Sequence, residues 1–62
     1  MAANFVIYKD KKGEFRWKMV HTNGQTIADS GEGYKAKASA INGVNSVKEN
    51  ASGAMIEDKT AA

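Results

Sequence analysis

The chain has 62 residues, no cysteine, one histidine, and nine Lys and Arg against seven Asp and Glu, which gives a formal net charge of +2. A domain of about 60 residues buries only roughly 60% of the surface that its unfolded chain exposes. Because the composition excludes disulfides and a clustered set of zinc ligands, we expect self-association to add the missing stability. The charge is too small to indicate a nucleic-acid binder by itself, and the chain contains neither a secretion signal nor the roughly 18 apolar residues of a membrane span. We therefore expect a soluble cytoplasmic protein with one domain over residues 1–62, of which 1–3 and 59–62 are disordered tails.

The first two strands are predicted to form a hairpin with one apolar face. Large apolar side chains alternate with cations at a period of two in 15–19, around the only tryptophan of the chain, which is typical of a half-buried strand. Residues 4–9 read as the first strand, with Phe5 and Ile7 on one face and Val6 and Tyr8 on the other. The residues between them read Asp-Lys-Lys-Gly-Glu, which favours a type I turn followed by a glycine in the left-handed conformation. A three-residue loop of this kind fixes the register. It pairs core residues across the hairpin, Ile7 with Trp17 and Phe5 with Met19.

The second hairpin needs the same kind of turn to keep its apolar side chains on one face. Asn23-Gly24 usually signals a two-residue loop, but that loop would turn Ile27 to the face away from Trp17. A three-residue loop sets Ile27 opposite Met19 instead. We therefore predict a third strand from Gln25 to about Asp29 and positive φ angles at both turn glycines, Gly13 and Gly24.

The period of the apolar residues changes after a Gly-rich and Ser-containing loop at 30–34. From about Lys37 to Asn50 they recur at spacings of three and four, which predicts the only helix of the chain. Its apolar stripe is Ala40, Ile41, Val44, Val47 and Ala51. Gly43 interrupts the helix at a cost of about 1 kcal/mol relative to Ala, so we expect the helix to approach the sheet or a partner helix closely there. A short fourth strand is predicted over Ala54–Asp58.

Several short motifs lie between Phe5 and Ala51. They are Ile7-Tyr8-Lys9-Asp10-Lys11-Lys12-Gly13-Glu14-Phe15-Arg16-Trp17, Asn23-Gly24-Gln25, Ala28-Asp29-Ser30-Gly31-Glu32-Gly33-Tyr34, the stretch from Ala38 to Gly43, and Ser46-Val47-Lys48. Each motif is weak alone, but the combination is specific. It resembles the YegP-like family of small bacterial proteins of uncharacterised function.

The resemblance implies an α+β fold, with an antiparallel three-stranded meander followed by one helix and a short C-terminal strand. Two units, in one chain or in a homodimer, form a continuous sheet in that family and exchange their C-terminal strands. With one unit, this chain is expected to be a homodimer that exchanges the strand containing Ala54, Met55 and Ile56. One departure is Ala36, where the family often has Ser, so the side-chain cap of the helix is lost. The family brings no established substrate, cofactor or catalytic residue.

Two glycines and two lysines before the helix form a candidate anion loop, Gly31, Gly33, Lys35 and Lys37. Backbone amides and cations can meet a phosphate in such a loop. The pattern nevertheless lacks the spacing and the Lys-Ser/Thr of a P-loop. An ordinary strand-to-helix turn is the favoured interpretation.

An aromatic residue and three cations form a candidate interaction surface, Tyr8, Lys9, Arg16 and Lys18. Tyr8, Arg16 and Lys18 are expected on the sheet face away from Trp17. A ring between cations is the minimum needed to stack a base and neutralise phosphates, and residues 1–28 carry five basic side chains against two acidic ones. A polar outer face with a few cations is also ordinary for a half-buried sheet.

No residue pattern indicates catalysis, and no cofactor or metal site is predicted. A hydrolase would need His21 beside a nucleophile and an orienting carboxylate, whereas its place next to a hairpin turn favours a structural or solvent-facing role. Asp29 and Glu32 are no stronger as a carboxylate pair, since Asp29 can accept hydrogen bonds from the backbone of the following loop. We therefore do not predict an enzyme.

Two functions of different classes remain. The first is a small dimeric interaction module, whose partners are a second copy of itself and a protein or small ligand. The alternative is a weak single-stranded nucleic-acid binder that uses the basic sheet face. Neither function involves a membrane. Salt separates the two, because counterion release makes the affinity of a nucleic-acid binder for its ligand fall steeply as salt is raised.

Overall fold

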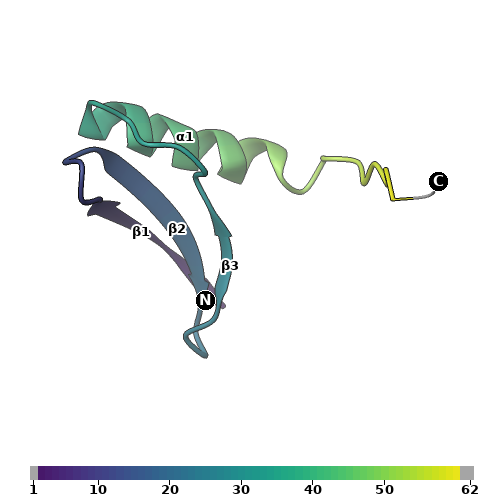
Figure 1. Cartoon of the computed structure of the whole chain (residues 1–62). Coiled ribbons are helices and arrows are strands. Elements are labelled where there is room, and N and C mark those ends of the chain that lie inside the picture. The colour runs from purple at the N-terminus through teal and green to yellow at the C-terminus, as the bar shows by residue number, and fades with distance from the viewer. Residues whose placement is uncertain (1, 61–62) are drawn as a thin grey trace.

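The computed structural model describes residues 2–60, which form a three-stranded sheet with one helix packed across it. In chain order the elements are β1 (Ala3–Lys9), β2 (Phe15–His21), β3 (Thr26–Asp29) and α1 (Lys37–Asn50). The sheet is antiparallel, in the order β1-β2-β3, and α1 lies over one face of it, while nothing in residues 2–60 covers the other (Figure 1). The predicted α+β class, the meander and the bounds of the helix are confirmed.

Both hairpin turns are the three-residue loops that the sequence predicts. The Asp10 N–H donates to the Glu14 carbonyl oxygen at 2.9 Å, and the His21 N–H donates to the Gln25 carbonyl oxygen at 2.8 Å. The φ angles of the two turn glycines are positive, 83° at Gly13 and 91° at Gly24. Glycine is suited to both positions because it has no Cβ to clash in the left-handed region.

The register of the sheet is confirmed between β1 and β2 but not between β2 and β3. The first hairpin has its expected pairs, Ile7 with Trp17 and Phe5 with Met19. In the second, Val20 pairs with Thr26 but Met19 pairs with Ala28, so the register shifts by one residue. The prediction that Ile27 lies opposite Met19 is wrong, and Ile27 is 54% exposed. Such a bulge changes the alternation of faces, so the small Ala28 takes the place expected for Ile27.

The core lies between α1 and the centre of β2. Trp17, Ala40 and Val44 are buried, and partly buried apolar and aromatic side chains pack against them, namely Phe5, Ile7, Phe15, Tyr34 and Val47. The rings of Phe5 and Trp17 meet edge to face with their centres 5.9 Å apart, a favourable geometry for aromatic pairs. Ile41 is 40% exposed, because it lies about 100° around the helix from Ala40 and so at the margin of the apolar stripe.

Gly43 marks the close approach of α1 to the sheet. A Cβ atom on Gly43 would lie 3.0 Å from Trp17 Nε1 and 3.0 Å from Tyr34 Oη. Tyr34 is held beside β2 by two backbone hydrogen bonds, from the Phe15 N–H at 2.7 Å and to the Phe15 carbonyl oxygen at 2.8 Å. The predicted loop at 30–34 therefore ends in Tyr34, which packs against the core. The glycines around Tyr34 favour a loop in the sequence and give no sign of this packing.

The helix starts at Lys37 without a side-chain cap, as expected from Ala36. The carbonyl oxygen of Ala36 accepts the N–H groups of Ser39 at 3.1 Å and Ala40 at 3.3 Å, so the first turn forms without the cap. α1 is too short to span a membrane, and none of residues 2–60 forms a helix with the length and apolarity needed to do so.

The N-terminal end of the chain belongs to the sheet. β1 begins at Ala3, and the Ala2 carbonyl oxygen accepts the Thr22 N–H at 3.0 Å. The predicted tail over 1–3 is therefore wrong for Ala2 and Ala3, while Met1 lies outside the described residues. The prediction fails because backbone hydrogen bonds hold Ala2 and Ala3 in the sheet, and such bonds do not require large side chains.

The C-terminal end leaves the body of the molecule after the helix (Figure 1). Ala54–Asp58, predicted to be a strand, lies outside every strand of the single chain, because within residues 2–60 it has no neighbouring strand with which to pair. Of the tail predicted over 59–62, Lys59 and Thr60 lie outside any helix or strand. Ala61 and Ala62 lie outside the described residues.

Candidate functional site

The open face of the sheet carries a half-exposed aromatic ring with a cation over it. Tyr8 in β1 is 38% exposed, and Lys18 in β2 places its Nζ atom 5.5 Å from the centre of the Tyr8 ring. Arg16 pairs directly with Tyr8 across the two strands. Because residues two apart on a strand point the same way, Tyr8, Arg16 and Lys18 share this face.

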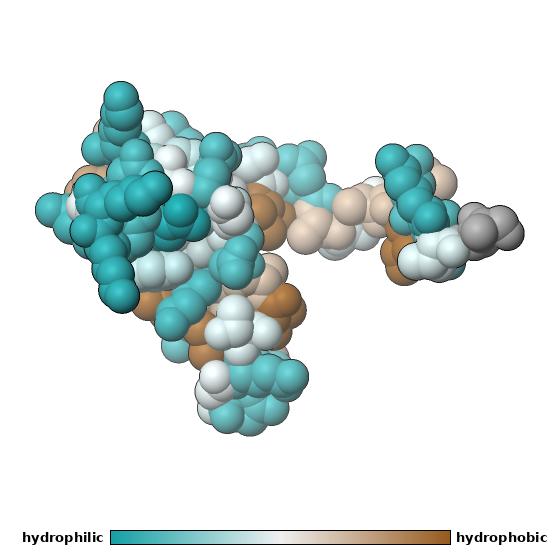
Figure 2. All heavy atoms as spheres, in the orientation of Figure 1, coloured by the Kyte–Doolittle hydropathy of each residue, from teal (hydrophilic) through white to brown (hydrophobic). Residues whose placement is uncertain are grey.

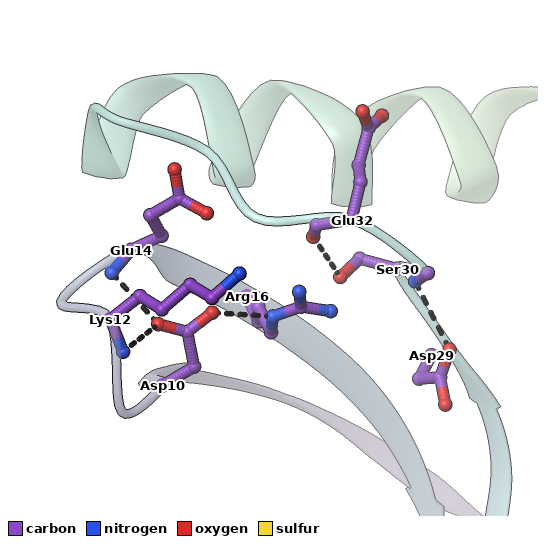
Figure 3. Close-up of polar contacts among 8 residues, drawn as sticks. Asp10, Lys12, Glu14, Arg16, Asp29, Ser30 and Glu32 are labelled. Atoms are coloured by element: carbon purple, nitrogen blue, oxygen red, sulfur yellow. Dashed lines mark hydrogen bonds and ion pairs between the residues drawn. The ribbon is translucent and has the colours of Figure 1, made fainter.

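Arg16 is already paired with an anion, because Asp10 binds it. Arg16 Nε donates to Asp10 Oδ2 at 2.7 Å, and Asp10 Oδ1 accepts the backbone N–H groups of Lys12 at 2.9 Å and Glu14 at 3.0 Å (Figure 3). The bond from Arg16 and those from the backbone hold the pKa of Asp10 below its ordinary value, and the bond to Asp10 raises the pKa of Arg16. Both groups stay ionised, and their charges cancel toward a distant anion.

Lys9 lies on the helix side of the sheet and not with the other three residues of the predicted surface. It pairs with Phe15, whose ring packs against the core, and its Nζ atom lies 5.2 Å from the centre of that ring. The predicted surface is therefore two separate groups. One contains Tyr8, Arg16 and Lys18, and the other contains Lys9 alone.

The candidate anion loop satisfies its own polar groups. Asp29 Oδ1 accepts the Gly31 N–H at 3.1 Å, and Ser30 Oγ donates to the Glu32 carbonyl oxygen at 2.8 Å (Figure 3). Gly31 has a φ of 71°, in the region that favours glycine. These bonds are those of a tight connection between β3 and the segment before the helix.

The Glu14 carboxylate lies against Gly33 of this loop. A Cβ atom on Gly33 would lie 2.8 Å from Glu14 Cβ, and the Glu14 carboxyl group reaches the same place. Because a carboxylate repels a second anion at short range, the loop itself is a poor anion site. Lys35 and Lys37 are exposed beyond it, and Glu14 does not stand between them and solvent.

The segment after the helix exposes two large apolar side chains. Met55 is 93% exposed and Ile56 is 96% exposed. The backbone of Ala54 bonds only to Ala51, at 3.3 Å, among the described residues. Figure 2 shows this segment as an arm that stands clear of the rest of the molecule. The outer edge of β1, which pairs only with β2 within residues 2–60, is one place where another strand could add.

Two of the groups considered for catalysis, His21 and Asp29, have structural partners. His21 Nδ1 accepts the Asn23 N–H at 3.2 Å, at the turn between β2 and β3. Asp29 is occupied by the Gly31 N–H, as expected. Across residues 2–60 no three His, Cys, Asp or Glu side chains come together in a way that could hold a metal ion.

Comparison with known proteins identifies the family. Residues 10–58 match the domain of unknown function DUF1508. The chain is also 52% identical over 56 residues to the UPF0339 protein Atu0232 of Agrobacterium fabrum, which is 90% of this chain and 89% of that protein. The chain belongs to the UPF0339 family. The YegP-like resemblance of its motifs is thereby confirmed.

Two solution NMR structures share the fold of this UPF0339 chain. A protein from Haloferax volcanii superimposes with a TM-score of 0.86 at 45% identity, over 90% of this chain and 93% of that one. Protein ATU0232 from Agrobacterium tumefaciens superimposes with a TM-score of 0.75 at 50% identity, over 94% of this chain and 92% of that one. The sheet and the helix are therefore shared with two relatives over nearly the whole chain.

A longer UPF0339 relative contains the same unit as part of its chain. The UPF0339 protein in the ptx operon 5′ region of Stutzerimonas stutzeri is 55% identical over 51 residues, which are 82% of this chain and 45% of that protein. The unit therefore occupies about half of the longer protein.

Proposed function

We propose that this UPF0339 chain is a homodimeric interaction module that adds its segment Ala54–Asp58 as a strand to the sheet of a second copy, so that the two sheets become continuous. The observation that carries the proposal is the near-complete exposure of Met55 and Ile56, 93% and 96%. Side chains of this kind are seldom left fully in water when a partner surface can cover them. No catalytic step is part of the proposal.

The small core of the single chain supports a dimer. Among residues 2–60 only Trp17, Ala40 and Val44 form the buried apolar core, and a domain of this size rarely gains more than about 3–5 kcal/mol from its own core. Neighbouring residues of a strand lie on opposite faces, so packing either Met55 or Ile56 on a partner would contribute about 1.5–3 kcal/mol. A strand added to an open edge also satisfies backbone groups that the edge otherwise exposes to water.

The longer Stutzerimonas relative supports the same assembly. Its matched segment is 45% of the protein, which leaves room for a second unit in one chain. A module that works as a pair can be built from two copies of a short chain or from two units of a long one. For the short chain, the pair has to form by association.

Truncation tests the proposal. A chain that ends at Gly53 should lose both association and much of its fold, whereas a chain that ends at Asp58 should keep both. The measurements are the molar mass by light scattering at micromolar concentration and the helix content by circular dichroism. A stable full-length monomer, or a folded dimer of the chain that ends at Gly53, would contradict the proposal.

Mixed labelling tests the exchange itself. In a dimer of one ¹³C-labelled and one unlabelled copy, filtered NOEs should connect the methyl groups of Met55 and Ile56 to sheet residues of the partner copy. If these methyl groups show NOEs only to residues of their own copy, the strand is not exchanged. Dimerisation would then be decided by the molar mass from light scattering.

A second candidate function is single-stranded nucleic-acid binding on the open face of the sheet. The half-exposed Tyr8 ring with Lys18 over it favours this candidate, and the cancellation of Arg16 by Asp10 weakens it. Tyr8→Ala should abolish binding to a single-stranded oligonucleotide if the ring stacks on bases. Equal binding by this variant and the unmodified chain would exclude the open face as the site.

A further inference from the structure

Five lysines from two distant parts of the sequence gather at one end of the molecule. Lys9 pairs with Phe15, and Phe15 pairs with Tyr34, so these three residues form one row across the sheet. The chain turns just beyond Lys9 and enters α1 just beyond Tyr34, and Figure 1 shows that turn and the start of α1 at the same end. We call this region the basic end, and it consists of Lys9, Lys11, Lys12, Lys35 and Lys37, all exposed.

The positive charge of the molecule is concentrated at the basic end. Of the three carboxylates on the adjoining segments, Asp10 is bound by Arg16, Glu14 is half-buried against Gly33, and Glu32 is exposed. The rest of the described chain carries more negative than positive charge. It has three lysines, Lys18, Lys48 and Lys59, and four carboxylates, Asp29, Glu49, Glu57 and Asp58. A net charge of +2 therefore hides an uneven distribution of charge along the molecule.

We propose that the basic end binds the phosphate backbone of a nucleic-acid duplex. Ammonium groups contact phosphates as point charges without reading the bases. Binding to single strands also needs exposed aromatic rings on which bases stack. The aromatic side chains at this end, Phe15 and Tyr34, pack in the core, and Lys9 lies over the Phe15 ring. A surface that binds the phosphate backbone and has no exposed ring for stacking suits a duplex. This surface is separate from the Tyr8 face and from the segment Ala54–Asp58.

Two matched double variants test this proposal against the rest of the surface. One replaces Lys11 and Lys35 with Gln at the basic end, and the control replaces Lys48 and Lys59 with Gln elsewhere. Each removes two positive charges, so the formal net charge falls from +2 to 0 in both. The probe is a fluorescein-labelled DNA duplex of mixed sequence, titrated by anisotropy from about 50 to 200 mM salt.

The expected result is weak, sequence-independent binding by the unmodified chain. Neutralising about three to five phosphates gives a slope of log K against log salt of about −3 to −4.5. The basic-end variant should flatten the slope by about 0.9 for each phosphate that a lysine no longer neutralises, while the control variant keeps the slope of the unmodified chain. Circular dichroism and light scattering show whether both variants are folded and equally assembled.

Two outcomes would overturn the proposal. One is the absence of duplex binding at about 50 mM salt, and the other is an equal weakening of binding in both variants. A weakening confined to the control variant would also overturn it, because binding would then belong to the surface outside the basic end.

Discussion

Asp10 shows how much one side chain can organise in a small domain. Its carboxylate accepts two backbone N–H groups of the β1–β2 turn and the Nε–H of Arg16. The same bonds fix the turn and neutralise the strongest cation of the open face. A surface that looks basic in the sequence is therefore less basic in the folded chain.

Replacing Asp10 with Asn should lower stability in a pH-dependent way. Because the folded-state pKa of Asp10 lies below its ordinary value of 3.8, its contribution is present above that value and disappears as pH falls through the folded-state pKa. Asn keeps an acceptor for the turn but loses the charge-assisted bond to Arg16. The free energies of unfolding of the two proteins, measured in urea, should therefore differ at pH 7, and the difference should narrow as pH falls below 3.8.

Asp29→Asn is the matched control for this variant. It makes the same chemical change in a loop where the carboxylate accepts the Gly31 N–H and, among the described residues, binds no cation. Its effect on the free energy of unfolding at pH 7 should be smaller, because no charge-assisted bond to a cation is lost. An equal loss of stability in the two variants at pH 7 would contradict the role given to Arg16.

At the scale of the elements, the packing of α1 on β2 depends on Gly43. A methyl group there would gain about 1 kcal/mol in helix propensity but would lie 3.0 Å from buried Trp17 Nε1 and from Tyr34 Oη. Overpacking in a core costs about 1–3 kcal/mol, and Trp17 is only 6% exposed, so it has little room to move. Gly43→Ala should therefore lower the free energy of unfolding by about 1 kcal/mol and change the Trp17 emission.

Asn45→Ala provides the control on the same helix. Asn45 is exposed, so the substitution gains helix propensity, about 0.5 kcal/mol, without a new contact to the sheet. Its urea midpoint should stay the same or rise. A rise for Gly43→Ala as well would mean that the helix can move away from Trp17 at little cost.

Most of the elements could be predicted from the sequence, because local signals fix them. The apolar period indicates the strands and the helix, and the two turn glycines fix the loop length and hence the β1–β2 register. The bulge at Ile27 and the pairing of Tyr34 with Phe15 could not be predicted. The place of Tyr34 depends on the packing of α1 against β2 in three dimensions. The bulge breaks the regular alternation of faces that parity along the sequence favours.

At the scale of the whole molecule, the candidate surfaces were harder to predict than the fold. The interaction surface predicted from the sequence combines Lys9 with Tyr8, although a strand places neighbouring residues on opposite faces. The same prediction does not connect the lysines of the first turn, Lys11 and Lys12, with Lys35 and Lys37 near the start of α1. Only the pairing of Tyr34 beside β2 brings those lysines to one end.

A dimer that supplies part of the stability should make unfolding depend on protein concentration. Mass action raises the melting temperature as concentration rises when folding and association are coupled. We expect this for the full chain over about a 100-fold range of concentration, and a lower, concentration-independent melting temperature for the chain that ends at Gly53. A full chain whose melting temperature stays constant over the same range would show that each copy is stable alone.

The exposed arm has a consequence for the lifetime of the protein in a cell. All residues from 51 to 60 are exposed in the single chain, and proteases cleave extended, unpaired segments of this kind most readily. Pairing of the arm with a second copy would remove it from their reach, because a strand in a sheet cannot enter a protease cleft without first coming apart. Copies in excess of their partners would then be degraded first, and the amount of assembled protein would be held steady against fluctuations in synthesis.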